Sequence, residues 1–149
     1  MSAPGPARPP YRPPARVDVQ IDAPRFSFIK RDDRGAIDFV SPLPCPFNYG
    51  SVPGTRSGDG DRIDALVLGA RRPRGLVRRL PVVAIAHFTD AGELDPKWIC
   101  AARPLGLGAY LQVDAFFRLY ALAKRALNRA RGKTGETRYD GIELLGGRG

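Results

Sequence analysis

Histidine and cysteine are scarce in this chain of 149 residues, which has one histidine and two cysteines. A single histidine, His87, excludes a histidine-rich metal site and most catalysis by a Ser/His/Asp triad. The two cysteines, Cys45 and Cys100, cannot make a disulfide framework, and we expect buried thiols in a reducing compartment.

Long apolar runs are also missing. No segment approaches the roughly 18 apolar residues of a membrane-spanning helix, and the first residues lack the apolar core of a secretory signal. We therefore expect neither a membrane span nor a signal peptide. The length and the hydrophobic content of 43% are those of one domain with a real core.

Acidic residues are outnumbered, since 15 Asp and Glu stand against 24 Lys and Arg, and the net charge is +9. Such a charge attracts polyphosphate-like anions or nucleic acid over long range. An arginine-rich composition explains it equally well. The basic helix predicted near the C-terminus has no interleaved aromatic platform, so a nucleic-acid partner is the weaker interpretation.

Six of the 15 acidic residues lie in two short loops. The first loop, DGDRID, contains Asp59, Asp61 and Asp64, and Gly58 and Gly60 let its backbone bend so that the carboxylates can converge. Three carboxylates this close repel one another unless a cation lies among them. Hard divalent cations such as Mg²⁺ prefer oxygen clusters of this kind.

The second acidic loop, TDAGELDPK, contains Asp90, Glu93 and Asp95, and Lys97 follows them. This loop comes after an apolar, strand-like run, and the first loop also adjoins a strand. The two loops could therefore face each other across one pocket. A lysine beside them suits a phosphate group better than a metal.

Alternating apolar and polar residues predict many short strands. They cover residues 17–22, 26–30, 36–40, 65–68, 76–79, 82–88 and 98–102, with Pro81 separating the fifth strand from the sixth and a turn at the NYG segment, 48–50. An amphipathic pattern predicts one helix over residues 112–131, which ends at Gly132. The predicted fold is mainly β (α+β), a small barrel with one long C-terminal helix.

The two ends of the chain have little core-forming character. Residues 1–16 contain six prolines and three arginines, which predicts a disordered tail. Residues 17–140 form the predicted folded domain. Residues 141–149 end in GGRG, and a frayed, glycine-rich tail is expected there.

Three segments in order resemble the signatures of soluble (family I) inorganic pyrophosphatases. They are the NYG turn at 48–50, the DGDxxD loop at 59–64 and the D-x(4)-D-x-K loop at 90–97, and the resemblance covers about residues 17–120. It implies an OB-like pyrophosphatase barrel and Mg²⁺-dependent hydrolysis of inorganic pyrophosphate, with Mn²⁺ as a possible substitute. It also implies a cytoplasmic location and a possible homo-oligomer.

The resemblance assigns a role to eight residues. The metal ligands would be Asp59, Asp64, Asp90 and Asp95, the base for water would be Asp61, and the phosphate contacts would be Tyr49, Lys97 and Tyr120. A core tyrosine with a satisfied hydroxyl is nearly as good an interpretation of Tyr120, because this residue lies on the apolar face of the predicted helix.

Several family positions carry other residues here. A glutamate, an arginine, a tyrosine and a lysine of the family are replaced by Gln20, Ser41, Cys45 and Ala121, and the second strand offers either Ser27 and Ile29 or, in a shifted register, Lys30 and Asp32. Each lost basic residue removes a charge-assisted phosphate contact. The alternative hypothesis is therefore a non-catalytic or substrate-shifted relative that binds metal and a phosphorylated ligand.

Overall fold

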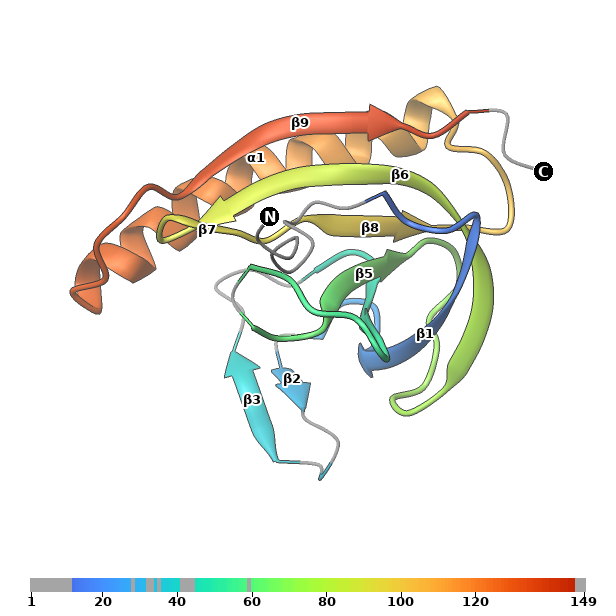
Figure 1. The fold of residues 1–149 in the computed structure, drawn as a ribbon, viewed down its shortest axis with the longest axis horizontal. Helices are drawn as coiled ribbons and strands as arrows, with labels where there is room; N and C mark the ends of the chain where they lie inside the picture. The colour runs from blue at the N-terminus through green and yellow to red at the C-terminus, as the bar shows by residue number, and fades with distance from the viewer. Residues whose placement is uncertain are drawn as a thin grey trace, which may run out of the picture.

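The computed structural model describes residues 12–27, 29–31, 34, 36–40, 45–58 and 60–146. Within these ranges the protein consists of nine strands and one long helix (Figure 1). The strands are β1 (Arg16–Ala23), β2 (Ile29–Arg31), β3 (Ile37–Val40), β4 (Asn48–Val52), β5 (Ile63–Val67), β6 (Val77–Asp90), β7 (Glu93–Leu94), β8 (Lys97–Cys100) and β9 (Arg138–Leu144), and the helix is α1 (Leu107–Ala130). No helix in these ranges is long and apolar enough to cross a membrane.

Five strands pair into a closed ring. β1 pairs antiparallel with β4 and β6, β4 pairs antiparallel with β5, β5 pairs in parallel with β8, and β8 returns antiparallel to β6. β7 and β9 extend the sheet from β6, while β2 and β3 form a separate hairpin that projects from the ring (Figure 1). This is the mainly β, barrel-like fold with one long helix that the sequence predicts.

Two predicted local features are wrong. β6 is one continuous strand that includes Pro81, instead of two strands separated by it. β6 pairs with β1 over residues 77–81 and with β8 over residues 82–86, so the proline lies where the strand changes partners and no N–H is needed. The NYG segment begins strand β4 instead of forming a turn, because β1 and β5 pair on either side of it.

Side chains alternate between the two faces of each strand, and this alternation produces two cores. One core fills the interior of the ring and includes Ile63 and Trp98. The other lies between the ring and α1 and includes Leu66, Ile99 and Phe117. A polar residue that shares a strand face with Leu66 or Ile99 is therefore placed beneath the helix.

The helix ends as predicted but begins before residue 112. Gly132 follows it with a φ of +69°, the left-handed conformation that ends many helices. The N–H of Gly132 donates to the Arg129 carbonyl at 3.2 Å, and the N–H of Lys133 donates to the Asn128 carbonyl at 2.9 Å. These two bonds fix the direction in which the chain leaves the helix toward β9.

The C-terminal strand continues past residue 140, where the sequence predicts a frayed tail. β9 pairs with β6 as far as Leu144, and Leu145 is buried in the interior of the ring. Sheet pairing and burial hold this segment, although its sequence is rich in glycine. Residues 147–149 lie outside the described part of the chain.

The N-terminal segment makes contacts just before β1. The carbonyl of Ala15 accepts a hydrogen bond from the N–H of Val82 at 3.0 Å, and Arg12 forms an ion pair with Glu143. Residues 1–11 lie outside the described part of the chain. The predicted tail and its boundary at residue 16 therefore stay a prediction.

Candidate active site

Two buried carboxylates and one buried ammonium meet on the outer face of the ring, beneath α1. Asp64 shares the face of β5 that carries Leu66, and Lys97 lies directly opposite Asp64 on the parallel strand β8. The Nζ atom of Lys97 lies 2.6 Å from Asp64 Oδ2 and 2.7 Å from Asp95 Oδ2. The Lys97 side chain is 3% exposed, and the two carboxylates are 12% and 8% exposed, so water is largely excluded.

Electrostatic attraction keeps this cluster charged. Burial by itself would lower the pKa of Lys97, but Asp64 and Asp95 outweigh burial, and the pKa is raised well above its usual value. Lys97 is therefore an ammonium at neutral pH. Removing one side of such a buried pair leaves an uncompensated charge, which typically costs about 3–5 kcal/mol.

Aromatic rings close the site around Lys97. The ring centroids of Tyr49 and Phe88 each lie 5.8 Å from its Nζ atom. Tyr120 of α1 packs on Phe88 with the two ring centroids 5.7 Å apart. Burial is the main cause that raises the pKa of Tyr49 and of Tyr120, so both hydroxyls keep their protons at neutral pH and can donate hydrogen bonds.

Asp95 is positioned by the hairpin between β6 and β7. Ala91 and Gly92 at its tip have φ angles of +50° and +87°, which is typical of a two-residue turn with both residues left-handed. The N–H of Ala91 donates to Thr137 Oγ1 at 3.0 Å, and the N–H of Gly92 donates to the Glu136 carbonyl at 2.8 Å. The segment that follows α1 therefore braces the acidic hairpin.

Asp90, at the other side of this hairpin, contacts the helix. Asn128 Nδ2 donates to Asp90 Oδ1 at 2.7 Å, and Lys124 Nζ lies 3.6 Å from Asp90 Oδ2. Both helix side chains are buried. The structure thus brings Asp64, Asp95 and Lys97 together and engages Asp90 with a second cation.

Lys124 is a candidate site residue that the sequence patterns do not single out, because a lysine on an amphipathic helix usually lies on its solvent-exposed face. Lys124 lies four residues after Tyr120 and therefore on the same helix face, which is the signal that could have identified it. Burial lowers the pKa of Lys124, while Asp90 acts in the opposite direction. Asp64 and Asp95 are called the acid pair. A buried lysine near this acid pair is a candidate contact for an anionic substrate.

The first acidic loop reaches the second through Gly58. Its N–H donates to the Leu94 carbonyl at 3.1 Å, and a Cβ added at Gly58 would lie 2.7 Å from that oxygen, so only glycine allows this approach. Asp61 is exposed, and its backbone carbonyl accepts a bond from Ser57 at 2.7 Å. Asp59 lies outside the described residues.

The acid pair fits a divalent cation chemically. In the part of the chain that the structure describes, no group of three or more His, Cys, Asp or Glu side chains could hold a metal. Asp64 and Asp95 nevertheless converge on one cationic atom, the Nζ of Lys97. Carboxylate oxygens arranged around an ammonium are the ligands that Mg²⁺ prefers, so the donor set suits that ion.

Comparison with known proteins identifies the family. A family model described as inorganic pyrophosphatase matches residues 30–112. The inorganic pyrophosphatase of Gluconobacter oxydans is 30% identical over 123 residues, 76% of this chain and 70% of that protein. The crystal structure of the inorganic pyrophosphatase from Thermus thermophilus matches with a TM-score of 0.69 and 28% identity, over 96% of this chain and 88% of that one. The chain belongs to the inorganic pyrophosphatase family.

Membership of the inorganic pyrophosphatase family confirms the predicted resemblance, the OB-like fold and the enzyme class, a diphosphatase that hydrolyses pyrophosphate. The chain covers less of some other relatives. The inorganic pyrophosphatase of Aquifex pyrophilus is 36% identical over 97 residues, which are 58% of this chain and 54% of that protein.

Four of the positions that depart from the family pattern lie within the described residues with their side chains. Ser27 is half-buried, and its N–H donates to the Pro24 carbonyl at 2.9 Å. Gln20 Oε1 accepts a hydrogen bond from Arg62 Nη1 at 3.4 Å. Cys45 and Ala121 are buried in the core between the ring and α1. Ser41, Asp32 and the side chain of Lys30 lie outside the described part of the structure, so the register of the second strand stays open.

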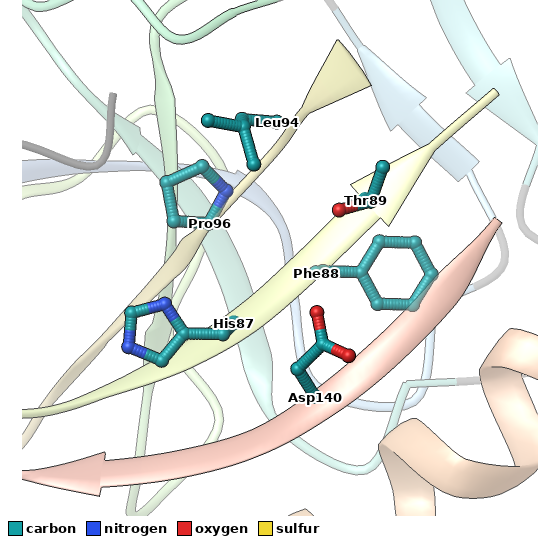
Figure 2. Close-up of a pocket in the computed structure, with 6 residues that line it drawn as sticks. All are labelled: His87, Phe88, Thr89, Leu94, Pro96 and Asp140. Carbon is teal, nitrogen blue, oxygen red and sulfur yellow. The ribbon is translucent and has the colours of Figure 1, made fainter. Parts of the chain in front are cut away.

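His87 lies away from the acid pair, in a pocket of about 220 Å³ formed by β6, β9 and the β7–β8 segment (Figure 2). Its Nε2 lies 3.0 Å from Glu143 Oε1 on β9. Figure 2 shows Thr89, Leu94 and Asp140 around the same pocket. The pocket has no buried acid pair, and the hydrogen bond to β9 supports a structural role for His87.

Proposed function

We propose that this chain hydrolyses inorganic pyrophosphate to two phosphates with Mg²⁺, or with Mn²⁺ as a substitute, at the acid pair. The observation that carries this proposal is the convergence of Asp64 and Asp95 on the buried ammonium of Lys97. Two carboxylates that bind one cationic group offer the same oxygens to a metal ion. Family membership supplies the reaction, since the relatives that match are inorganic pyrophosphatases.

The metal would be held by the acids of the two loops. Asp64 and Asp95 form the buried half of this set, and Asp59 and Asp90 complete it by the family pattern. When bound, the cation neutralises charge on the phosphoryl oxygens and acidifies the attacking water. With Asp64 and Asp95 engaged in this way, the Lys97 ammonium would be available to the substrate.

Asp61 would accept the proton of the attacking water. The residue is exposed, so water and a substrate from solution can reach it. As the new phosphorus–oxygen bond forms, the bridging bond of pyrophosphate breaks and its oxygen leaves with the second phosphate. The proton on Asp61 then passes to solvent, and the base is restored.

The phosphate groups would meet a different set of side chains. Lys97 supplies a positive charge, and the protonated hydroxyls of Tyr49 and Tyr120 donate hydrogen bonds. We add Lys124, whose buried ammonium lies one helical turn from Tyr120 and 3.6 Å from Asp90. It supplies a charge close to the one that is missing at Ala121.

The test is release of phosphate from pyrophosphate with Mg²⁺ by the wild type and by Asp61→Asn. We expect the variant to lose about 10²–10⁴-fold in kcat, because general-base catalysis contributes about that much. Binding of Mn²⁺ should be retained, and Asp18→Asn, an exposed acid on β1, should behave as the wild type. In the same assay, Lys124→Gln should raise KM for pyrophosphate more than it lowers kcat.

Two results would overturn the proposal. One is a wild type that binds Mn²⁺ and releases no phosphate, which is the behaviour of a non-catalytic or substrate-shifted relative. The other is unchanged turnover by Asp61→Asn, which would remove the base. A cytoplasmic location and assembly into a homo-oligomer are parts of the same proposal, and cell fractionation and analytical ultracentrifugation would test them.

A further inference from the structure

A second pocket, of about 310 Å³, lies where α1 ends and the chain turns toward β9. Its lining consists of three basic residues, two buried polar residues, one glycine and one acid: Arg125, Arg129 and Lys133, Asn128 and Thr137, Gly135, and Glu136. The single acid is engaged elsewhere, because Glu136 Oε2 pairs with Arg138 at 2.9 Å. The pocket is therefore positively charged.

The basic side chains are held together by the fold. Arg125 and Arg129 lie one helical turn apart and therefore on one helix face. The N–H of Lys133 is fixed to the Asn128 carbonyl at 2.9 Å, which returns the chain to the same place. Among the residues that the structure describes, these three cations form no ion pair with a carboxylate. Their mutual repulsion would be relieved by a bound anion.

Asn128, which lines the pocket, has a side-chain oxygen that needs a hydrogen-bond donor. The residue is 4% exposed, and its Nδ2 already donates to Asp90 and to Thr137. Its Oδ1 is buried and has no hydrogen-bond partner within the described part of the chain. A buried acceptor without a donor is costly. Hydrogen phosphate carries a P–OH group that can donate to it, whereas sulfate carries none at neutral pH.

Hydrogen bonds and a close backbone approach connect the pocket to the acidic hairpin. Asn128 bonds Asp90 at 2.7 Å, and Thr137 accepts the N–H of Ala91 at 3.0 Å. Gly135 lies so close to the hairpin that an added Cβ would be 2.5 Å from the Ala91 carbonyl oxygen. An anion bound between the helix end and this segment would therefore hold the hairpin in place. It would also offset the positive charge near Asp90, which favours a cation at the acid pair.

We propose that this pocket is a second anion site, selective for hydrogen phosphate, that strengthens metal binding at the acid pair. Binding to the pocket stands by itself, while its effect on the metal rests on the proposed function. Coupling of this kind is reciprocal, so the metal should strengthen phosphate binding by the same factor.

The binding test uses the metal-free full chain in EDTA, titrated with inorganic phosphate by calorimetry and by amide NMR. Arg129→Gln/Lys133→Gln should weaken binding about tenfold or more, because two charge-assisted contacts are lost. Arg103→Gln/Arg131→Gln removes the same charge outside the pocket and should stay within about twofold of the wild type. The shifted amides should be those of residues 132–137.

Sulfate and glycerol 2-phosphate complete the titration. At pH 8 both carry no P–OH group to donate to Asn128 Oδ1, so each should bind about fivefold more weakly than hydrogen phosphate. If the two double variants bind phosphate with equal affinity, the pocket is not the phosphate site. Equal affinity for phosphate and sulfate would overturn its selectivity.

The coupling test measures Mn²⁺ affinity with and without phosphate. Phosphate should tighten Mn²⁺ binding severalfold in the wild type and not in Arg129→Gln/Lys133→Gln. An equal gain in both would show that phosphate acts at the acid pair, which would overturn the coupling. If the wild type binds no Mn²⁺ at all, the proposed function fails, and the metal-free titration still decides whether the pocket binds phosphate.

Discussion

The two acidic loops differ in how firmly the rest of the chain holds them. The hairpin that carries Asp90 and Asp95 is tied to the segment after α1 by hydrogen bonds from Ala91 and Gly92. The loop that carries Asp61 is exposed, and it touches the hairpin through the backbone of Gly58.

This difference divides the site into a part that the fold sets and a part that ligands complete. Asp64, Asp95 and Lys97 already form a closed ion cluster, in which the lysine holds the place of a cation. Asp61 is exposed, which suits the exchange of protons with water that the proposed function gives it. In the proposed function a metal would bind Asp64 and Asp95 in place of Lys97, and Asp61 would serve as the base for the attacking water.

The largest expected effect comes from removing Lys97, the ammonium that balances Asp64 and Asp95. Lys97→Met leaves Asp64 and Asp95 buried without their ammonium, and we expect the free energy of unfolding to fall by about 3–5 kcal/mol in EDTA. Mg²⁺ should restore more stability to this variant than it adds to the wild type, because it can replace the lost charge. Urea unfolding with and without Mg²⁺ measures both quantities.

The matched control is Lys133→Met, which removes an exposed lysine and should change stability by no more than about 0.5 kcal/mol. If Mg²⁺ stabilises Lys97→Met no more than the wild type, Lys97 does not hold the place of the metal. The division of the site into two parts would then lose its main support.

The second prediction separates the close contact of Gly135 with the acidic hairpin from the backbone strain that an alanine would cause there. Gly135 and Gly141 have similar φ angles, +97° and +99°, so an alanine at either position costs about 1–2 kcal/mol in strain. Only Gly135→Ala would also push a Cβ against the Ala91 carbonyl, whereas Gly141 faces open space. We expect Gly135→Ala to lose more stability and about tenfold in Mg²⁺ affinity, since a displacement worth about 1.4 kcal/mol is tenfold.

For Gly135→Ala and Gly141→Ala, calorimetry would measure the Mn²⁺ affinity and urea unfolding would measure the stability. Gly60→Ala, in the exposed loop, has a φ of +87° and open space around it, so it should resemble Gly141→Ala in stability. Equal Mn²⁺ affinity in Gly135→Ala and Gly141→Ala would show that the brace does not position the acids.

The fold and half of the site follow from local patterns in the sequence. Strand alternation and the amphipathic helix predict a mainly β ring with one helix, and the acid loops name Asp64, Asp95 and Lys97. Pro81 was misjudged because local propensity suggests a break, while the partners that β6 exchanges at that point arise only in the assembled sheet.

The rest of the site depends on contacts between distant segments. Asn128 and Thr137 bind the acidic hairpin from 38 and 46 residues away, at Asp90 and Ala91. No spacing rule links such positions. Lys124 was missed for a different reason, because a charged residue on a helix is usually solvated, and only tertiary packing decides which face is covered.

The smallest expected effect tests whether the region beside the acid pair is dry. Burial raises the pKa of Cys45 to about 11, against 9.0 for an ordinary thiol. The unfolded thiol ionises from pH 9 upward and the folded one does not, so stability is present below pH 9 and is lost as pH rises through about 11. From pH 9 to pH 10 this thiol should cost about 1 kcal/mol of unfolding free energy.

Urea unfolding of the wild type and of Cys45→Ala at pH 7, 9 and 10 isolates this contribution. The alanine variant loses packing equally at every pH, so only the difference in slope reports the thiol. Lys124 acts in the opposite direction, because its lowered pKa makes stability rise with pH up to its unfolded value of 10.5, and it is common to both proteins. Equal slopes would mean that water reaches Cys45 and that the core beside Lys97 is open.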